Sequence, residues 1–110
     1  MNIKDRQEKE YKRLIKLFDG VSTEKLKAVD GMIQRAAFMR VALEDLEDVV
    51  DKEGVLDLFE QGDYTYNREH PALKSYNQTV KNYNATMKQI VEALPEDAKS
   101  DELIDYIAGR

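Results

Sequence analysis

The side chains best suited to chemistry are carboxylates that cluster in the middle of the 110-residue chain. Glu44 is followed three residues later by Glu47 and four residues later by Asp48, and these spacings place the carboxylates on one face of a helix. Carboxylate oxygens are ligands that Mg²⁺ prefers. A second motif of this kind occurs only at Glu102 and Asp105, far along the chain. A solvated acidic face is therefore the favoured interpretation, and we expect no metal or other cofactor.

The remaining candidates for catalysis are isolated. His70 is the only histidine and the chain has no cysteine, and one histidine does not make a zinc site. The five glycines stand apart, so none belongs to a glycine-rich loop that binds phosphate. Since His70 directly precedes Pro71, and proline suits the first turn of a helix, we expect His70 to cap that helix. The chain is therefore predicted not to be an enzyme.

Basic side chains are concentrated in the first part of the chain, although the net charge of the whole is −5. Residues 1–40 carry a net charge of +4, residues 41–70 carry −8 and residues 71–110 carry −1. A site for a polyanion such as DNA is therefore confined to residues 1–40, and the acidic stretch from Glu44 to Asp63 must point away from it. The candidate nucleic-acid-binding residues are Lys9, Lys12, Arg13, Lys16, Lys25, Lys27 and Arg35.

A predicted helix over residues 4–18 positions the first four of these cations. Its apolar residues recur every three or four positions and form one face, and the cations between residues 9 and 16 repeat this spacing nearly opposite. Asp5 falls on the basic side as well, so the alternative that these charges only solvate the helix stays open. The apolar face consists of Tyr11, Leu14, Ile15 and Phe18.

Two longer stretches dominate the predicted fold. Apolar residues recur at alternating intervals of three and four from Val29 to Val50, and again from Leu73 to Leu94. This alternation is typical of the narrow seam between two packed helices. The sequence therefore predicts an all-α protein built on a long antiparallel helical hairpin, residues 21–53 and 71–94. The seams are Val29, Met32, Ala36, Met39, Leu43, Leu46 and Val50, and Leu73, Tyr76, Val80, Tyr83, Met87, Ile90 and Leu94.

The shorter segments are expected to complete a single helical domain, residues 1–110. Residues 1–20 form its basic N-terminal amphipathic helix, and Asp30-Gly31 is expected to break or kink the helix that follows. Residues 55–70 form a connector in which two short stretches can pair as a small β-hairpin. Residues 95–110 form a C-terminal segment with a short C-terminal helix that begins at Ser100.

Apolar residues outside the seam point to an oligomeric protein. Ile33, Phe38 and Val41 lie off the main stripe of the central helix, and one partner helix cannot cover all three. The first helix or a neighbouring subunit is expected to cover them. We assign Ile33, Phe38 and Val41 to an oligomer interface on this basis.

Nothing in the sequence predicts a membrane or export segment. The longest apolar runs are four residues, too short to span a bilayer, and the charged N-terminus lacks the apolar stretch of a signal peptide. The absence of cysteine is compatible with a reducing cytosol. We therefore expect no membrane association and an intracellular location.

Two stretches of the chain resemble the phage terminase small subunit family, above all members from phages and prophages of Gram-positive bacteria. The first is Asp30-Gly31-Met32-Ile33-Gln34-Arg35-Ala36-Ala37-Phe38-Met39, continuing through Leu43-Glu44-Asp45-Leu46 to Lys52-Glu53-Gly54-Val55. The second is His70-Pro71-Ala72-Leu73-Lys74-Ser75-Tyr76-Asn77 and the helix after it. The resemblance covers roughly residues 4–95. After Leu94 the chain reads Pro-Glu-Asp-Ala-Lys-Ser and departs from the family's Gly-Leu-Thr-Pro-like ending.

The resemblance implies a non-catalytic, ring-forming component of viral DNA packaging. It would recognise double-stranded phage DNA in the cytoplasm of the bacterial host and bring it to the terminase large subunit, which carries ATPase and nuclease activity. A helical adaptor or regulatory protein without DNA binding is the alternative, and a Mg²⁺-dependent nucleotide pyrophosphohydrolase is a remote one. Ring assembly and salt-sensitive DNA binding would distinguish the first from the second, and nucleotide turnover would reveal the third.

Overall fold

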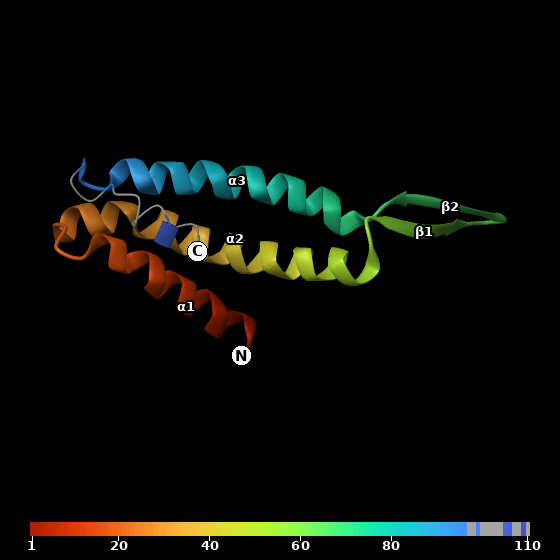
Figure 1. Ribbon diagram of the computed structural model, residues 1–110, viewed down its shortest axis with the longest axis horizontal. Coiled ribbons are helices and arrows are strands. Elements are labelled where there is room, and N and C mark those ends of the chain that lie inside the picture. Colours follow the sequence, from red (N-terminus) through yellow and green to blue (C-terminus); the bar gives the residue numbers. More distant parts are fainter. Residues whose placement is uncertain (97–98, 100–104, 107–108, 110) are drawn as a thin grey trace.

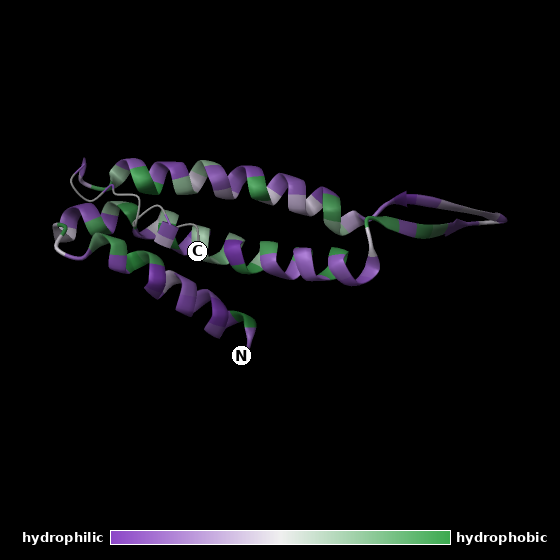
Figure 2. Ribbon diagram, in the orientation of Figure 1, coloured by the Kyte–Doolittle hydropathy of each residue, from purple (hydrophilic) through white to green (hydrophobic). Residues whose placement is uncertain are grey.

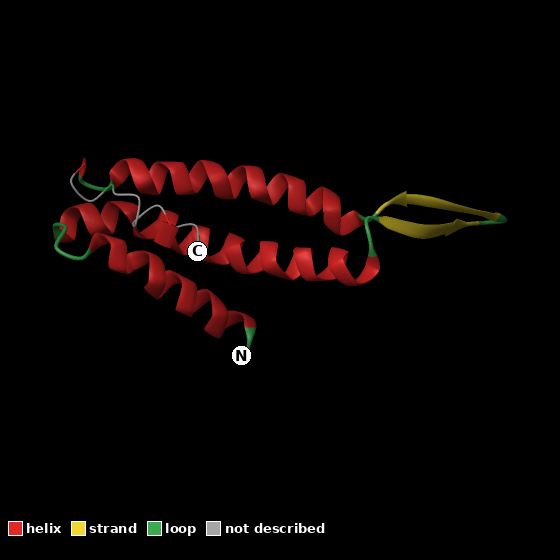
Figure 3. Cartoon of the chain, in the orientation of Figure 1, coloured by secondary structure: helices red, strands yellow, loops and turns green. Residues whose placement is uncertain are grey.

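The protein is elongated, with a helical body and a β-hairpin that projects from one end (Figure 1). A computed structural model describes residues 1–96, 99, 105, 106 and 109, and its extents are 62 × 26 × 23 Å. Most of the described part is helical, as predicted (Figure 3). In chain order the elements are α1 (Ile3–Ile15), the 3₁₀ helix η1 (Lys16–Phe18), α2 (Thr23–Glu53), β1 (Leu56–Gln61), β2 (Tyr64–Glu69) and α3 (Pro71–Ala93).

Helices α2 and α3 pack side by side in antiparallel order, which confirms the predicted helical hairpin (Figure 1). Every residue of the two predicted seams is buried or half-buried, and Figure 2 shows apolar residues recurring along both helices. The seam is most deeply buried toward the C-terminal end of α3, where Met87, Ile90 and Leu94 belong to the main core together with Val29 and Ala36. The hairpin is therefore anchored at the end of the molecule opposite the β-strands.

Helix α1 supplies a third layer to this core by packing against α2. Leu14 and Phe18 join Ile33 in the main core cluster. Ile33 and Val41 are 0% and 2% exposed, so their assignment to an oligomer interface has to be corrected: both are already covered within the single chain. Phe38 is 59% exposed and keeps a free surface.

Helix α2 runs without interruption through Asp30 and Gly31, so a break at this point is wrong, whereas the predicted alternative of a kink stays a prediction. A glycine inside a helix costs only about 1 kcal/mol relative to alanine. The Asp30 carboxylate accepts hydrogen bonds from the Tyr11 hydroxyl and, at 2.7 Å, from Nε2 of Gln34. Together with the burial of Ile33, these contacts hold the helix together through the glycine.

Strands β1 and β2 form the antiparallel hairpin that the connector sequence predicts. Their register ends on Gln61 opposite Tyr64, which leaves Gly62 and Asp63 as a two-residue turn. Gly62 has a positive φ of 61°, which glycine adopts without a steric penalty. The strands extend beyond the ends of the helices, and all of β2 is exposed (Figure 3). The connector is therefore a projecting arm and no part of the core.

His70 lies where the arm joins the helices, and it caps α3 as predicted. Its Nδ1 accepts a hydrogen bond from Ala72 N at 3.1 Å, and its Nε2 lies 3.2 Å from Oε1 of Glu53, at the end of α2. Its backbone N–H donates to the carbonyl of Val55 at 2.8 Å. His70 thus links both long helices to the base of the arm.

The predicted C-terminal helix from Ser100 lies for the most part outside the described residues. Tyr106, which is described, contacts α1. In the part of the chain that the structure describes, no helix is long and apolar enough to cross a membrane.

Candidate nucleic-acid interface

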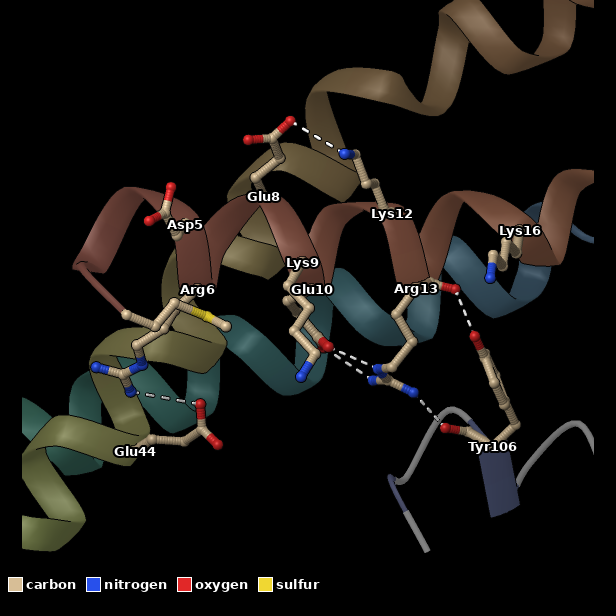
Figure 4. A pocket seen from close by; sticks show the side chains of 11 residues that line it. Asp5, Arg6, Glu8, Lys9, Glu10, Lys12, Arg13, Lys16, Glu44 and Tyr106 are labelled. Atoms are coloured by element: carbon tan, nitrogen blue, oxygen red, sulfur yellow. Dashed lines mark hydrogen bonds and ion pairs between the residues drawn. The ribbon is translucent and has the colours of Figure 1, made fainter.

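A groove beside α1 gathers the basic side chains that the sequence singles out (Figure 4). Its volume is about 740 Å³, and Lys9, Lys12, Arg13 and Lys16 all line it. These four residues span about 10 Å of the helix axis, since each residue of an α-helix advances ~1.5 Å. The groove is also lined by Met1, Asp5, Arg6, Glu8, Glu10, Glu44 and Tyr106.

The charges of the groove are nearly balanced, because its lining holds five cationic side chains and four carboxylates. Lys12 Nζ lies 3.3 Å from Glu8 Oε1, but both side chains are more than 60% exposed, and an ion pair so open to water is weak and screened by salt. Within the described residues, Lys9 and Lys16 form no ion pair. Lys9, Lys12 and Lys16 are therefore the cations available to an incoming polyanion.

Arg13, in contrast, is held within the protein. Its Nε and Nη2 donate hydrogen bonds to both carboxylate oxygens of Glu10, at 2.6 and 2.8 Å, and these hydrogen bonds raise the pKa of Arg13 above its ordinary value. The guanidinium lies 5.2 Å from the ring centre of Tyr106, whose hydroxyl donates to the Arg13 carbonyl at 2.9 Å. The position of Arg13 therefore favours a structural role, in which it holds Tyr106 against α1, over the predicted contact with nucleic acid.

The other three predicted cations lie on α2 and do not line the groove. Lys25, Lys27 and Arg35 are all exposed. Lys27 and Arg35 fall on the same side of α2 as Phe38, since residues turn by about 100° per position along a helix. The seven predicted residues therefore do not form one surface. Four line the groove at α1, Lys27 and Arg35 lie on the side of α2 that bears Phe38, and Lys25 lies nearly opposite Lys27 on that helix.

No protein-family model, curated protein or solved structure matches the chain. The assignment of function rests on the residues themselves.

Part of the acidic stretch lies beside the basic groove, contrary to the expectation that it points away. Glu44 lines the groove. Arg6 connects the two regions, because its Nη1 lies 2.7 Å from Oδ1 of Asp45 and its Nη2 lies 3.7 Å from Oε1 of Glu44. These carboxylates reduce the positive potential at one end of the groove and leave the end near Lys16 the more attractive to phosphate.

The carboxylates farther along α2 are engaged one by one and do not converge. Glu47 accepts a hydrogen bond from the Tyr76 hydroxyl at 3.0 Å, and this bond raises the pKa of Tyr76. Asp48 Oδ2 lies 2.9 Å from Lys52 Nζ. Glu102, which belongs to the second candidate motif, lies outside the described residues. Among the residues that are described, no group of three or more His, Asp or Glu could hold a metal ion.

Among the residues of the groove that escaped the sequence analysis are Arg6, Glu10 and Tyr106. The pairing of Glu10 with Arg13 had a readable signal, because side chains three positions apart are neighbours on a helix. The contact of Arg6 with Asp45 joins residues 39 positions apart, and that of Tyr106 with Arg13 spans 93 positions. Local spacing carries no information about either.

Proposed function

We propose that this chain is the small subunit of a viral DNA-packaging terminase. In this role it binds double-stranded phage DNA in the cytoplasm of the bacterial host, assembles into a ring and brings the DNA to a large subunit with ATPase and nuclease activity. The observation that supports DNA binding best is the row of exposed lysines on α1, Lys9, Lys12 and Lys16, in a chain that is acidic overall. The sequence resemblance over residues 30–55 and 70–77 supports the family.

The row of lysines suits a phosphate backbone better than it suits base edges. Duplex DNA carries one charge per ~1.7 Å of axis, so a row of about 10 Å can contact several phosphates. Each contact releases condensed counterions, which makes binding steeply dependent on salt. The described helices give no element whose side chains are placed to read bases, and the expected binding is therefore insensitive to sequence at this surface.

Oligomerisation would make the lysines of α1 an effective DNA-binding surface. A protomer with three phosphate contacts, next to Glu8 and Glu44, binds weakly at physiological salt. Several copies in one ring present the same lysines repeatedly, so that the first contact raises the effective concentration of the others. DNA affinity should therefore rise with the extent of oligomerisation.

A helical adaptor without DNA binding is the second candidate, and the near balance of charge in the groove favours it. Five cations facing four carboxylates leave only a small positive excess. In that case the lysines of α1 would only keep the helix solvated.

The test is a comparison of two triple variants with the same net charge. Lys9→Ala/Lys12→Ala/Lys16→Ala removes the row on α1, whereas Lys74→Ala/Lys81→Ala/Lys88→Ala removes three exposed lysines from α3. Affinity for a labelled DNA duplex is measured at several salt concentrations, and assembly is followed by native mass spectrometry.

The α1 variant should bind more weakly, and the slope of log affinity against log salt should become shallower by about 0.9 for each phosphate that the protein no longer neutralises. The α3 variant should retain both affinity and slope. Equal behaviour of the two variants would exclude α1 as the DNA surface. Absence of DNA binding by the unmodified oligomer would favour the adaptor.

A further inference from the structure

The two faces of the projecting hairpin differ in how many of their side chains contact a partner within the hairpin. On one face Arg68 Nη2 lies 3.1 Å from the Asp57 carboxylate, and the Arg68 guanidinium lies 4.2 Å from the ring centre of Phe59. Phe59 and Tyr66 meet edge to face, with ring centres 5.5 Å apart. Four side chains of this face therefore have partners within the hairpin itself, whereas Tyr64, beside the turn, is 77% exposed.

The opposite face, which we call the leucine face, is uncovered. Leu56 and Leu58 are 57% and 63% exposed, although residues opposite one another in an antiparallel pair share a face and could shield them. A two-stranded hairpin is only marginally stable alone in water, and large exposed apolar side chains on it indicate a partner. The leucine face consists of Leu56, Leu58, Glu60, Thr65, Asn67 and Glu69.

The charge of the leucine face selects the kind of partner. Glu60 and Glu69 flank the two leucines, and the one cation of the strands, Arg68, is engaged on the other face. DNA and other polyanions are therefore repelled. A fitting partner carries an exposed apolar group with positive charge beside it.

The exposed side of α2 has this complementary character. Phe38 is 59% exposed, and Arg35 and Lys27 lie on the same side of the helix, about 4.5 and 16.5 Å before it along the axis. Asp45 follows Phe38 on this side and is paired with Arg6. In the part of the chain that the structure describes, neither Lys27 nor Arg35 forms an ion pair. We call this surface the Phe38 side, defined by Lys27, Arg35 and Phe38.

We infer that the leucine face of one copy of this chain docks on the Phe38 side of a second copy. Leu58 then packs against Phe38, and Glu60, two residues along the strand from Leu58, approaches Arg35, the cation nearest to Phe38. The contact cannot form within one chain, because the arm points away from α2 (Figure 1) and Phe38 lies about 22 Å before the end of that helix.

The geometry of this contact bears on the form of the assembly. The two surfaces are different patches of the same molecule, so each copy offers one free surface to the next. Contacts of this heterologous kind close into a ring when the rotation between copies allows it. The inference therefore rests on the ring assembly of the proposed function and names the surfaces that form it.

The absence of cysteine from the chain allows a direct test with single-cysteine variants. Leu58→Cys protein is mixed with Phe38→Cys protein under mild oxidation, and disulfide-linked dimers are counted by mass spectrometry. Tyr64→Cys is the matched control, since Tyr64 is 77% exposed but lies on the opposite face of the hairpin. A linked pair is expected from Leu58→Cys with Phe38→Cys and not from Tyr64→Cys with Phe38→Cys.

A second comparison measures the contribution of the contact to assembly. Leu58→Asp should weaken association of the copies about tenfold or more in sedimentation experiments, because it places another negative charge and no apolar group against Phe38. Tyr64→Asp should associate as the unmodified chain does. Circular dichroism should show the same helix content in all three proteins.

The outcomes separate this inference from the proposed function. An intact oligomer that gives no Leu58–Phe38 link overturns the contact and leaves terminase-like assembly and DNA binding standing. Linking of Leu58→Cys to itself, without Phe38→Cys, also overturns it, because the arms would then pair with each other. A monomer at every concentration overturns both the contact and the ring, whereas the α1 lysine variants report on DNA binding independently.

Discussion

Arg6 on α1 and Asp45 on α2 connect the basic and acidic parts of the chain, with Nη1 of Arg6 2.7 Å from Oδ1 of Asp45. The hydrogen bond to Asp45 is the main cause that raises the pKa of Arg6 above its ordinary value. The other end of α1 is joined covalently to α2 through residues 16–22. The Arg6 contact therefore restrains the N-terminal end of α1 and, with it, the direction in which Lys9 and Lys12 project.

Replacement of Arg6 by alanine should loosen α1 locally. The backbone amides in the first turns of α1 should exchange with solvent faster, while those of α2 and α3 keep their protection, because the pair lies at the protein surface. Lys4→Ala is the control, since Lys4 is an exposed cation of the same helix. Equal exchange in the two variants would mean that the Arg6–Asp45 pair does not restrain α1.

Gly31→Ala should stabilise the protein, because α2 is continuous at this position. A Cβ built on Gly31 would lie 3.5 Å from Nη2 of Arg35, which is ordinary contact. Alanine should therefore raise the free energy of unfolding in urea by about 0.5–1 kcal/mol. Gly54→Ala is the opposite case, since Gly54 ends α2 with φ 85° and ψ 171°, a conformation almost restricted to glycine, and alanine there should cost about 1–3 kcal/mol. Destabilisation by Gly31→Ala would contradict the continuous helix.

The helical hairpin could be predicted from the sequence because the apolar spacing that specifies each helix is a local pattern. A helix that packs along its whole length repeats apolar residues at intervals of three and four, and the two seams kept this rhythm over six consecutive steps each. The cap at His70 was readable for the same reason, since its side chain contacts the backbone only two positions away. These predictions are confirmed.

The features that the sequence did not predict depend on contacts between distant parts of the chain. In the sequence, Ile33 and Val41 look like surplus apolar surface, because neither helix alone indicates that α1 packs on α2. Arg13 was assigned to nucleic-acid binding because its contact with Tyr106, 93 positions away, cannot be inferred from local spacing. The effect of Gly31 was judged without the tertiary hydrogen bond between Tyr11 and Asp30. The candidate DNA site stays a prediction: the exposed lysines of α1 are among the residues that the sequence singles out, whereas the structural contacts of Arg13 could not be read from it.

Leu43→Ala should lower the free energy of unfolding by about 2–5 kcal/mol, since it removes a buried side chain from the seam between α2 and α3. Leu43 is 5% exposed and lies with Tyr76, Val80 and Tyr83 around a small hollow of about 220 Å³. Phe38→Ala, on the exposed side of the same helix, should change the stability of the isolated protomer far less. Urea unfolding at low protein concentration compares the two, and a small effect of Leu43→Ala would mean that this part of the seam is not core.

The hydrogen bond from the Tyr11 hydroxyl to Asp30 should make stability depend on alkaline pH. The bond raises the pKa of Tyr11 above its ordinary value, with burial and the negative charge of Asp30 as further causes. The folded protein thus holds this proton more firmly than the unfolded chain does. The stabilising contribution is therefore complete below the ordinary tyrosine pKa of about 10 and is lost as the pH rises through the higher pKa of the folded state.

Tyr11→Phe isolates this effect, because phenylalanine keeps the ring and removes the hydroxyl. Near neutral pH the variant should be less stable by about 1 kcal/mol, a modest loss because Asp30 keeps its hydrogen bond from Gln34. The difference in free energy of unfolding should stay constant up to about pH 9 and shrink above about pH 10. The other tyrosines, including Tyr76 with its raised pKa, are common to both proteins and cancel in this difference. A difference that is the same on both sides of the tyrosine pKa would show that the hydroxyl of Tyr11 does not bind Asp30 in solution.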